Sequence, residues 1–285
     1  MKLALAVVAC AAWVAATGCA SLPVGGAAGE LLQESLNEGE KFAVYVPPGE
    51  APAGGWPCIV FLNGSGECGT DGRKQTTVGL MPAVWAASTR WPFVIVLPQK
   101  PTRESKWLDH KELMMACLNA AKEQWSIDEG RIYLTGLSQG GNGTWEIAAA
   151  YPGLFAAVAP VCGYVDPQMN ANRWEGDGAT IAEAVLITPV WAFHGACDDV
   201  VPAAQTRRMV AALDALAVEM PGPRKLRAVQ VSKDDGTRSP LRITIYPDLD
   251  HGCWDRAYRE AGLPEWFLRF GPAETGDRPT PKSLQ

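Results

Sequence analysis

The sequence predicts an α/β fold in which a mainly parallel central sheet is covered by helices on both faces. Short, continuous apolar runs recur along the chain, and such runs are typical of strands buried in a parallel sheet. Segments of helical character separate these runs, and this alternation is the pattern of parallel α/β folds. With 285 residues, 47% of them hydrophobic and 20% charged, the chain is long enough for one large core.

The predicted strands and helices alternate from residue 41 to residue 270. The first strand, residues 41–46, stops at Pro47 and Pro48 and is expected at a sheet edge. The other strands are predicted at residues 58–62, 91–97, 131–137, 155–161, 189–193 and 241–246. Helices are predicted at residues 113–125, 141–151, 203–218 and 254–270. Residues 227–231 fit either an extra strand or a surface loop.

The N-terminal segment, residues 1–18, has the pattern of a secretory signal. Lys2 is its one charge, and the apolar stretch that follows is too short to span a bilayer comfortably. The segment ends in Ala16-Thr17-Gly18-Cys19, which resembles the bacterial lipobox, where the cysteine is acylated and becomes the mature N-terminus. An ordinary signal peptide with a coincidental cysteine is the alternative. We therefore expect a protein of the cell envelope, lipid-anchored at the outer membrane or periplasm, or secreted.

Composition divides the rest of the chain into three parts. Residues 19–37 are expected to form a tether that follows the lipid anchor, because their first ten positions are rich in Gly, Ala and Ser. Residues 38–271 are expected to form one folded domain. Residues 272–285 are rich in Pro, Thr, Asp and Gly and are expected to be a disordered tail.

Charge and cysteine spacing limit the partners of this domain. The formal net charge is −6 and no Lys/Arg cluster stands out, which argues against nucleic acid and against a membrane contact other than the lipid anchor. The eight cysteines include no CxxC pair and no cluster with histidine. We therefore expect no metal and no cofactor.

A G-x-S-x-G motif, Gly136-Leu137-Ser138-Gln139-Gly140, lies between a predicted strand and a predicted helix. In this context the motif is typical of a sharp turn that exposes the serine hydroxyl, with glycines where a side chain would clash. Ser138 is therefore the candidate nucleophile. The alternative is that Ser138 caps the following helix.

A nucleophilic serine needs a histidine base that is oriented by a carboxylate, and in this arrangement the chain order is Ser, then Asp or Glu, then His. Of the three histidines, His251 follows the last predicted strand and fits the order. His194 ends its own strand and is interpreted as structural, and His110 as a surface residue. The loop after the preceding strand offers Asp198 and Asp199 as the acid.

Two backbone amides are needed to bind the negative charge that develops on a carbonyl oxygen. The amide of Gln139, directly after the serine, is the first. The second is expected in the loop Asn63-Gly64-Ser65-Gly66, with Ser65 preferred and Gly64 as the alternative.

These motifs, together with their flanking residues, resemble the esterase and predicted-peptidase branch of the α/β-hydrolases, related to secreted polyhydroxybutyrate depolymerases and feruloyl esterases. The resemblance extends over residues 40–270 and rests on residues 61–71, 131–141 and 191–202 and on His251 with Trp254 and Tyr258. It implies that Asp198 is the acid. Asn63 stands where the family usually has histidine, and Cys68 where it usually has arginine.

The resemblance implies a serine hydrolase that cleaves small or polymer-linked carboxylic esters through an acyl-enzyme. A serine peptidase of the prolyl-oligopeptidase-like type and a non-catalytic surface-binding lipoprotein are the alternatives. Residues 163–187 leave little room for a lid, so we expect an open site, with Trp107, Trp174 and Trp254 as wall residues or as ordinary packing residues. A disulfide between Cys197 and Cys253 would join the acid and base loops; unpaired thiols are the alternative.

Overall fold

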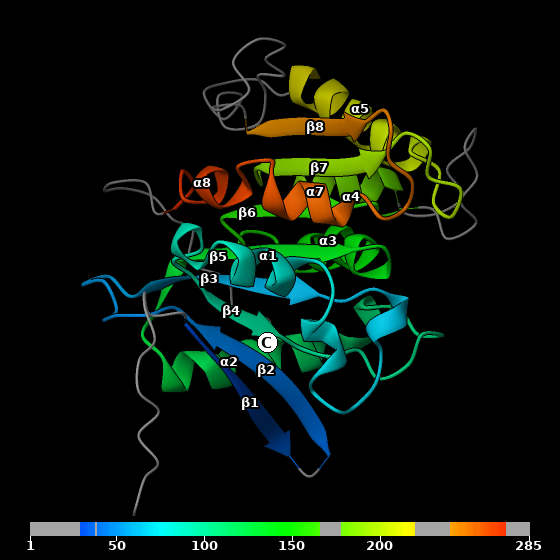
Figure 1. Cartoon of the computed structure of the whole chain (residues 1–285). Helices are drawn as coiled ribbons and strands as arrows, with labels where there is room; N and C mark the ends of the chain where they lie inside the picture. The colour runs from blue at the N-terminus through cyan, green and yellow to red at the C-terminus, as the bar shows by residue number, and fades with distance from the viewer. Residues whose placement is uncertain (1–28, 38, 166–177, 220–239, 272–285) are drawn as a thin grey trace, which may run out of the picture.

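The computed structural model describes residues 29–37, 39–165, 178–219 and 240–271 (Figure 1). The predicted signal, the lipidation site, Trp174, residues 227–231 and the predicted tail lie outside these ranges.

An eight-stranded sheet forms the centre of the molecule, in the order β1-β2-β4-β3-β5-β6-β7-β8 (Figure 1). Neighbouring strands from β4 to β8 run parallel, whereas β2 pairs antiparallel with both β1 and β4. The predicted α/β fold is confirmed. The strands are β1 Glu30–Asn37, β2 Glu40–Val46, β3 Trp56–Leu62, β4 Val94–Leu97, β5 Ile127–Leu137, β6 Ala157–Val161, β7 Val190–Gly195 and β8 Leu241–Tyr246.

Helices cover both faces of the sheet. One apolar cluster packs the sheet against α2, α3, α4 and α5, and a second packs the opposite face against α1, α7 and α8. The α-helices are α1 Leu80–Ala86, α2 Lys111–Gln124, α3 Gln139–Ala150, α4 Gly178–Val185, α5 Ala204–Glu219, α7 Trp254–Arg259 and α8 Leu263–Phe267. Short 3₁₀ helices are η1 Ser65–Glu67, η2 Lys74–Thr76, η3 Ser88–Arg90 and η4 Leu108–His110.

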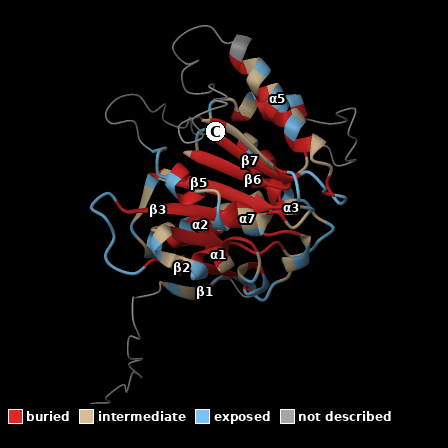
Figure 2. Cartoon of the chain, turned by 45° about the horizontal axis from the view of Figure 1, so that its top comes forward, coloured by how far each residue is buried: buried red, intermediate tan, exposed pale blue. Residues whose placement is uncertain are grey.

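The central strands are apolar on both sides because both sides are buried (Figure 2). In β3, Cys58 and Val60 belong to the first apolar cluster, and Ile59 and Phe61 to the second. Successive side chains of a strand point to opposite faces, so a strand between two helical layers needs apolar residues at every position. This explains the continuous apolar runs of the sequence.

The start of the fold and the last helix differ from the prediction. The fold begins at Glu30 rather than at residue 38, because residues expected in the tether form β1 and pair with β2. No side chain described in β1 is fully buried, so this edge strand lacks an apolar run. The predicted helix 254–270 is divided into α7 and α8 at Gly262, whose φ of 75° interrupts the helical backbone. Helix α1 was not predicted.

Helix α3 approaches β3 so closely that Gly140 has no room for a side chain. A Cβ atom at Gly140 would lie 1.9 Å from the Leu62 carbonyl oxygen and 2.9 Å from that of Asn63. Both obstacles are backbone atoms and cannot turn away.

We predict that Gly140→Ala lowers the free energy of unfolding by about 3 kcal/mol or more, because overpacking here must displace a helix from a strand. Gly54→Ala is the control, since a Cβ atom at Gly54 meets nothing within 4 Å. It should change stability by less than about 0.5 kcal/mol. Urea denaturation followed by tryptophan fluorescence compares the two, and equal stability of both variants would contradict the packing analysis.

Candidate active site

Ser138 occupies a sharp turn between β5 and α3. Its backbone has φ 55° and ψ −115°, a conformation that a residue with a side chain adopts only where its surroundings enforce it. The Ser138 amide donates to the Val161 carbonyl over 3.0 Å, and its carbonyl accepts from the Asn142 amide over 3.0 Å. The hydroxyl makes no capping hydrogen bond to α3. The helix-cap interpretation of Ser138 is therefore wrong.

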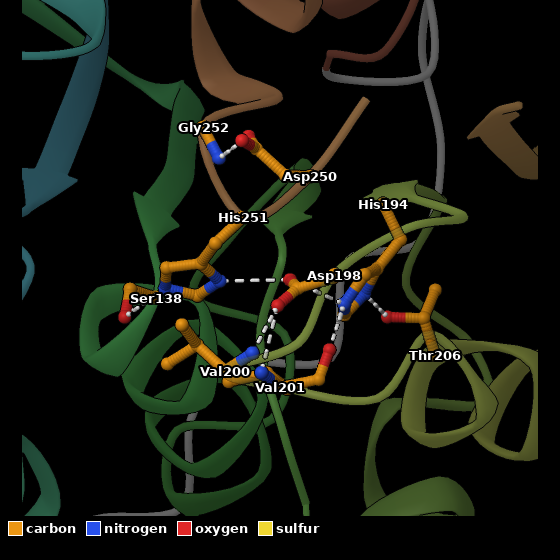
Figure 3. A network of polar contacts seen from close by, with 9 residues as sticks. All are labelled: Ser138, His194, Asp198, Val200, Val201, Thr206, Asp250, His251 and Gly252. Atoms are coloured by element: carbon orange, nitrogen blue, oxygen red, sulfur yellow. Dashed lines mark hydrogen bonds and ion pairs between the residues drawn. The ribbon is translucent and has the colours of Figure 1, made fainter. Parts of the chain in front are cut away.

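The Ser138 hydroxyl begins a chain of two side-chain hydrogen bonds (Figure 3). Ser138 Oγ lies 2.9 Å from His251 Nε2, and His251 Nδ1 lies 2.7 Å from Asp198 Oδ2. A carboxylate can only accept, so Nδ1 carries the ring proton and Nε2 is left to accept from the serine. The structure thus brings together three side chains that are far apart in the sequence.

The topology explains this meeting. Ser138 follows β5, Asp198 follows β7, and His251 follows β8. These strands are parallel, so their carboxyl ends share one edge of the sheet, where α/β proteins place their sites. Asp198 is buried in this edge, whereas Asp199 is exposed. The sequence motifs left Asp198 and Asp199 as alternatives for the acid, and Asp198 is the one that reaches His251.

Asp198 is held as a carboxylate. Its Oδ1 accepts from the amides of Val200 and Val201 over 2.9 and 2.8 Å. Burial of the carboxyl raises its pKa, but hydrogen bonds from His194, His251 and the Val201 amide outweigh this effect and hold the pKa well below its usual range. The group is therefore ionised at neutral pH.

His194 supports Asp198 from the other side (Figure 3). Its Nε2 lies 2.8 Å from the Val201 carbonyl oxygen and 3.1 Å from Asp198 Oδ2, so Nε2 carries the proton. Nδ1 lies 2.7 Å from Thr206 Oγ1 and can accept from that hydroxyl. The interpretation of His194 as a structural residue agrees with its complete burial, but the sequence analysis missed its contact with the acid. The spacing of four residues between His194 and Asp198 spans the end of β7, and only the path of the following loop brings the two side chains into contact.

A cavity of about 460 Å³ lies beside the loop that holds Ser65. It is lined by Ser65, Gly66, Cys68, Pro101, Thr102, Arg103 and Glu104. Gln139 touches this wall, since its Nε2 donates to the Arg103 carbonyl over 2.9 Å. The cavity therefore adjoins the start of α3, and Cys68, one of the two departures from the family pattern, is part of its lining.

The predicted aromatic wall is only partly present. Trp107 is completely buried and its Nε1 donates to the Asn63 carbonyl over 2.9 Å, so it is a packing residue and not a wall residue of an open site. This hydrogen bond satisfies the indole N–H, so its burial leaves no donor unpaired. Trp254 is partly buried and stands edge-to-face with His251, with 5.6 Å between the ring centroids. It lies beside the imidazole and stays a candidate for contact with substrate.

The disulfide hypothesis for Cys197 and Cys253 is wrong in this structure, because both are free. Cys197 is exposed and its thiol donates to the Pro247 carbonyl over 3.4 Å. Cys253 is buried in the same apolar cluster as Cys162. The two side chains therefore lie in different environments, one at the surface and one in the core.

Within the described ranges, no group of three or more His, Cys, Asp or Glu side chains could hold a metal ion. None of the helices in these ranges is both long and apolar enough to cross a bilayer.

The strand order and the sharp turn carrying Ser138 are those of the α/β-hydrolase fold. The solved structure of a thermostable esterase matches this one with a TM-score of 0.62 and 26% identity, over 86% of this chain and 63% of the esterase. The feruloyl esterase module from Clostridium thermocellum matches with a TM-score of 0.61 and 15% identity, over 89% of this chain and 92% of the module. The second match shows the fold alone.

The chain is also similar in sequence to poly(3-hydroxyalkanoate) depolymerase C of Paucimonas lemoignei, with 29% identity over 134 residues. This match covers 42% of the chain and 30% of the depolymerase. The chain therefore spans less than a third of that relative and less than two thirds of the thermostable esterase. No family model matches the chain.

The environment of Asp198 predicts how an Asp198→Asn variant responds to pH. A carboxyl with a lowered pKa in the folded state stabilises the protein above its unfolded pKa of about 3.9, and this contribution is lost as the pH falls toward the folded value. We expect the variant to be less stable than the wild type by about 2 kcal/mol at pH 7, with a difference that shrinks below about pH 4.

Urea denaturation at several pH values measures this difference. Asp199→Asn is the matched control, because Asp199 is the exposed neighbour of Asp198 and should leave stability nearly unchanged. A gap between wild type and Asp198→Asn that stays constant down to pH 3 would contradict the proposed hydrogen-bonded carboxylate.

Proposed function

We propose that this chain is a serine hydrolase that cleaves carboxylic esters through an acyl-enzyme. The observation that carries the proposal is the continuous hydrogen-bonded chain from Ser138 through His251 to the buried Asp198. A serine hydroxyl is a weak nucleophile, and an imidazole whose far nitrogen is held by a carboxylate is the base that activates it.

In the proposed reaction, Ser138 Oγ attacks the ester carbonyl carbon while His251 Nε2 takes the hydroxyl proton. Asp198 stays ionised and stabilises the resulting imidazolium. His251 then returns the proton to the departing alcohol as the carbon–oxygen bond breaks, leaving an acyl group on Ser138. Water repeats the same sequence in the second half and releases the acid.

The amides of Gln139 and Ser65 are the proposed donors to the oxyanion. Gln139 is the first residue of α3, and the first amides of a helix have no partner within the helix. The Gly64 amide is the alternative to Ser65, and Gly64 lies close to the Glu67 carboxyl group, since a Cβ atom at Gly64 would be 3.0 Å from Glu67 Oε2. Burial raises the pKa of that carboxyl, and the Gly64 amide acts against the rise. Ser65 is therefore the preferred donor.

Similarity favours ester over amide substrates. Two similar proteins above 25% identity are an esterase and a depolymerase, whereas an acylaminoacyl peptidase from Pyrococcus horikoshii is 15% identical and supports the fold alone. The lining of the cavity beside Ser65 includes Thr102, Arg103 and Glu104, which offer polar contacts to the alcohol or acyl part of a polar ester.

We predict that Ser138→Ala lowers kcat for p-nitrophenyl acetate by about 10³-fold or more while the thermal unfolding transition persists, because the nucleophile is lost and the fold is not. A fluorophosphonate probe should label the wild type and not the variant. Ser35→Ala, on the exposed side of edge strand β1, is the control and should keep full activity.

Two outcomes would reject the proposal. Full activity of Ser138→Ala would exclude Ser138 as the nucleophile. A folded wild type that neither reacts with the probe nor hydrolyses a panel of esters and peptide amides would indicate a non-catalytic binding protein, whereas faster cleavage of the amides would indicate a peptidase.

We also propose that Cys19 is lipidated and anchors the protein in the cell envelope, on the strength of the lipobox resemblance of residues 16–19. Cells fed a palmitate analogue should incorporate the label into the mature protein, and Cys19→Ser should abolish the label, because the acylated thiol is gone. Labelling that survives in Cys19→Ser, or is absent from the wild type, would reject the anchor.

A further inference from the structure

We propose that Asn63 is a positioning residue, which turns the peptide group between Gly64 and Ser65 so that the Ser65 amide faces the oxyanion. This inference rests on the proposed ester hydrolysis and concerns the residue that replaces the family's usual histidine. It gives that replacement a role.

Asn63 is completely buried at the end of β3 and its amide group is fixed at both ends. Its Oδ1 accepts from the Lys100 backbone amide over 3.2 Å. A backbone amide can only donate, so this contact identifies the oxygen of the Asn63 side chain and leaves its NH₂ group to face the loop. That NH₂ group donates to the Gly64 carbonyl over 2.6 Å.

The hydrogen bond to Gly64 determines where the Ser65 amide points. The Gly64 carbonyl and the Ser65 N–H belong to one planar trans peptide group, in which the C=O and N–H bonds point in opposite directions. When Asn63 holds the carbonyl, the Ser65 N–H must point in the opposite direction. We infer that this direction is toward the oxyanion that forms beside Ser138. Rotation of this peptide would instead present a carbonyl oxygen to the oxyanion, which would repel it.

Most neighbouring contacts hold other groups of the loop, and only the Cys68 thiol also reaches the Gly64 carbonyl. The Asn63 carbonyl accepts from Trp107 Nε1 over 2.9 Å, and Gln99 Nε2 donates to the Glu67 carbonyl over 3.0 Å. The Cys68 thiol lies 3.5 Å from the Gly64 carbonyl oxygen, and a thiol is a weak donor. Asn63 is thus the stronger of the two side-chain donors to the Gly64 carbonyl.

The first variant is Asn63→Asp, which keeps the size of the side chain and the acceptor for Lys100 but replaces the NH₂ group by an oxygen that repels the Gly64 carbonyl. We expect kcat for p-nitrophenyl acetate to fall by about 10²–10³-fold with little change in KM, which is the usual effect of losing an oxyanion donor. Inhibition by a trifluoromethyl ketone, whose adduct with serine carries an oxyanion, should weaken in parallel.

The second variant, Ser65→Pro, removes the proposed donor itself. Proline has no N–H, is tolerated at the first position of a helix, and favours an extended preceding residue. Ser65 is the first residue of η1, and Gly64 is extended with φ −75° and ψ −175°. We expect a similar fall in kcat, and little further loss in the double variant, because both changes remove the same interaction.

Gln75→Ala is the matched control. Gln75 is also fully buried and its Nε2 donates to the Leu97 carbonyl over 3.1 Å, so the variant loses a comparable bond outside the loop. Its thermal stability should fall while kcat stays within about twofold of wild type, as for a substitution away from the reacting groups. Thermal melting identifies the folded variants, and Asn63→Ala, which also removes the NH₂ donor, takes the place of Asn63→Asp should the latter not fold.

The outcomes separate the two proposals. An inactive wild type would reject the ester hydrolase itself. An active wild type with unchanged kcat in Asn63→Asp, or losses that multiply in the double variant with Ser65→Pro, would reject the positioning role of Asn63 and leave the hydrolase proposal in place.

Discussion

The hydrogen bond of 2.7 Å between Asp198 and His251 is the interaction on which the site depends. It determines which ring nitrogen carries the proton, and so which nitrogen is free to accept from Ser138. The geometry of this bond is fixed because the Asp198 carboxylate accepts from two backbone amides and also contacts His194. A group with all its acceptor positions engaged cannot turn away from the imidazole.

Much of the fold could be predicted because the parallel strands are buried on both faces. That burial leaves continuous apolar runs such as residues 58–62, which are readable without any alignment. Strand β1 escaped prediction for the opposite reason, since an edge strand with no fully buried side chain has no such run. The turn at Gly262 was not predicted either, because a single glycine in a helical pattern is compatible both with a continuous helix and with a helix end.

The site was predictable where a sequence motif encodes geometry and unpredictable where tertiary contacts decide. The G-x-S-x-G spacing around Ser138 is a local signal, and the acid and the base follow it in a fixed chain order. The structure brings Ser138, Asp198 and His251 together. Burial of Trp107 depends on a partner 44 residues away, the Asn63 carbonyl. The contact of His194 with the acid likewise needs the path of the loop after β7, which no local pattern specifies.

The six cysteines of the described residues are all free, and Cys58, Cys117, Cys162 and Cys253 are buried. Burial raises the pKa of the Cys58 and Cys117 thiols to about 12, which keeps them protonated and chemically quiet. Cohesion of this domain therefore comes from its two apolar layers and not from covalent cross-links. We therefore expect a domain made of these residues to fold without an oxidising environment.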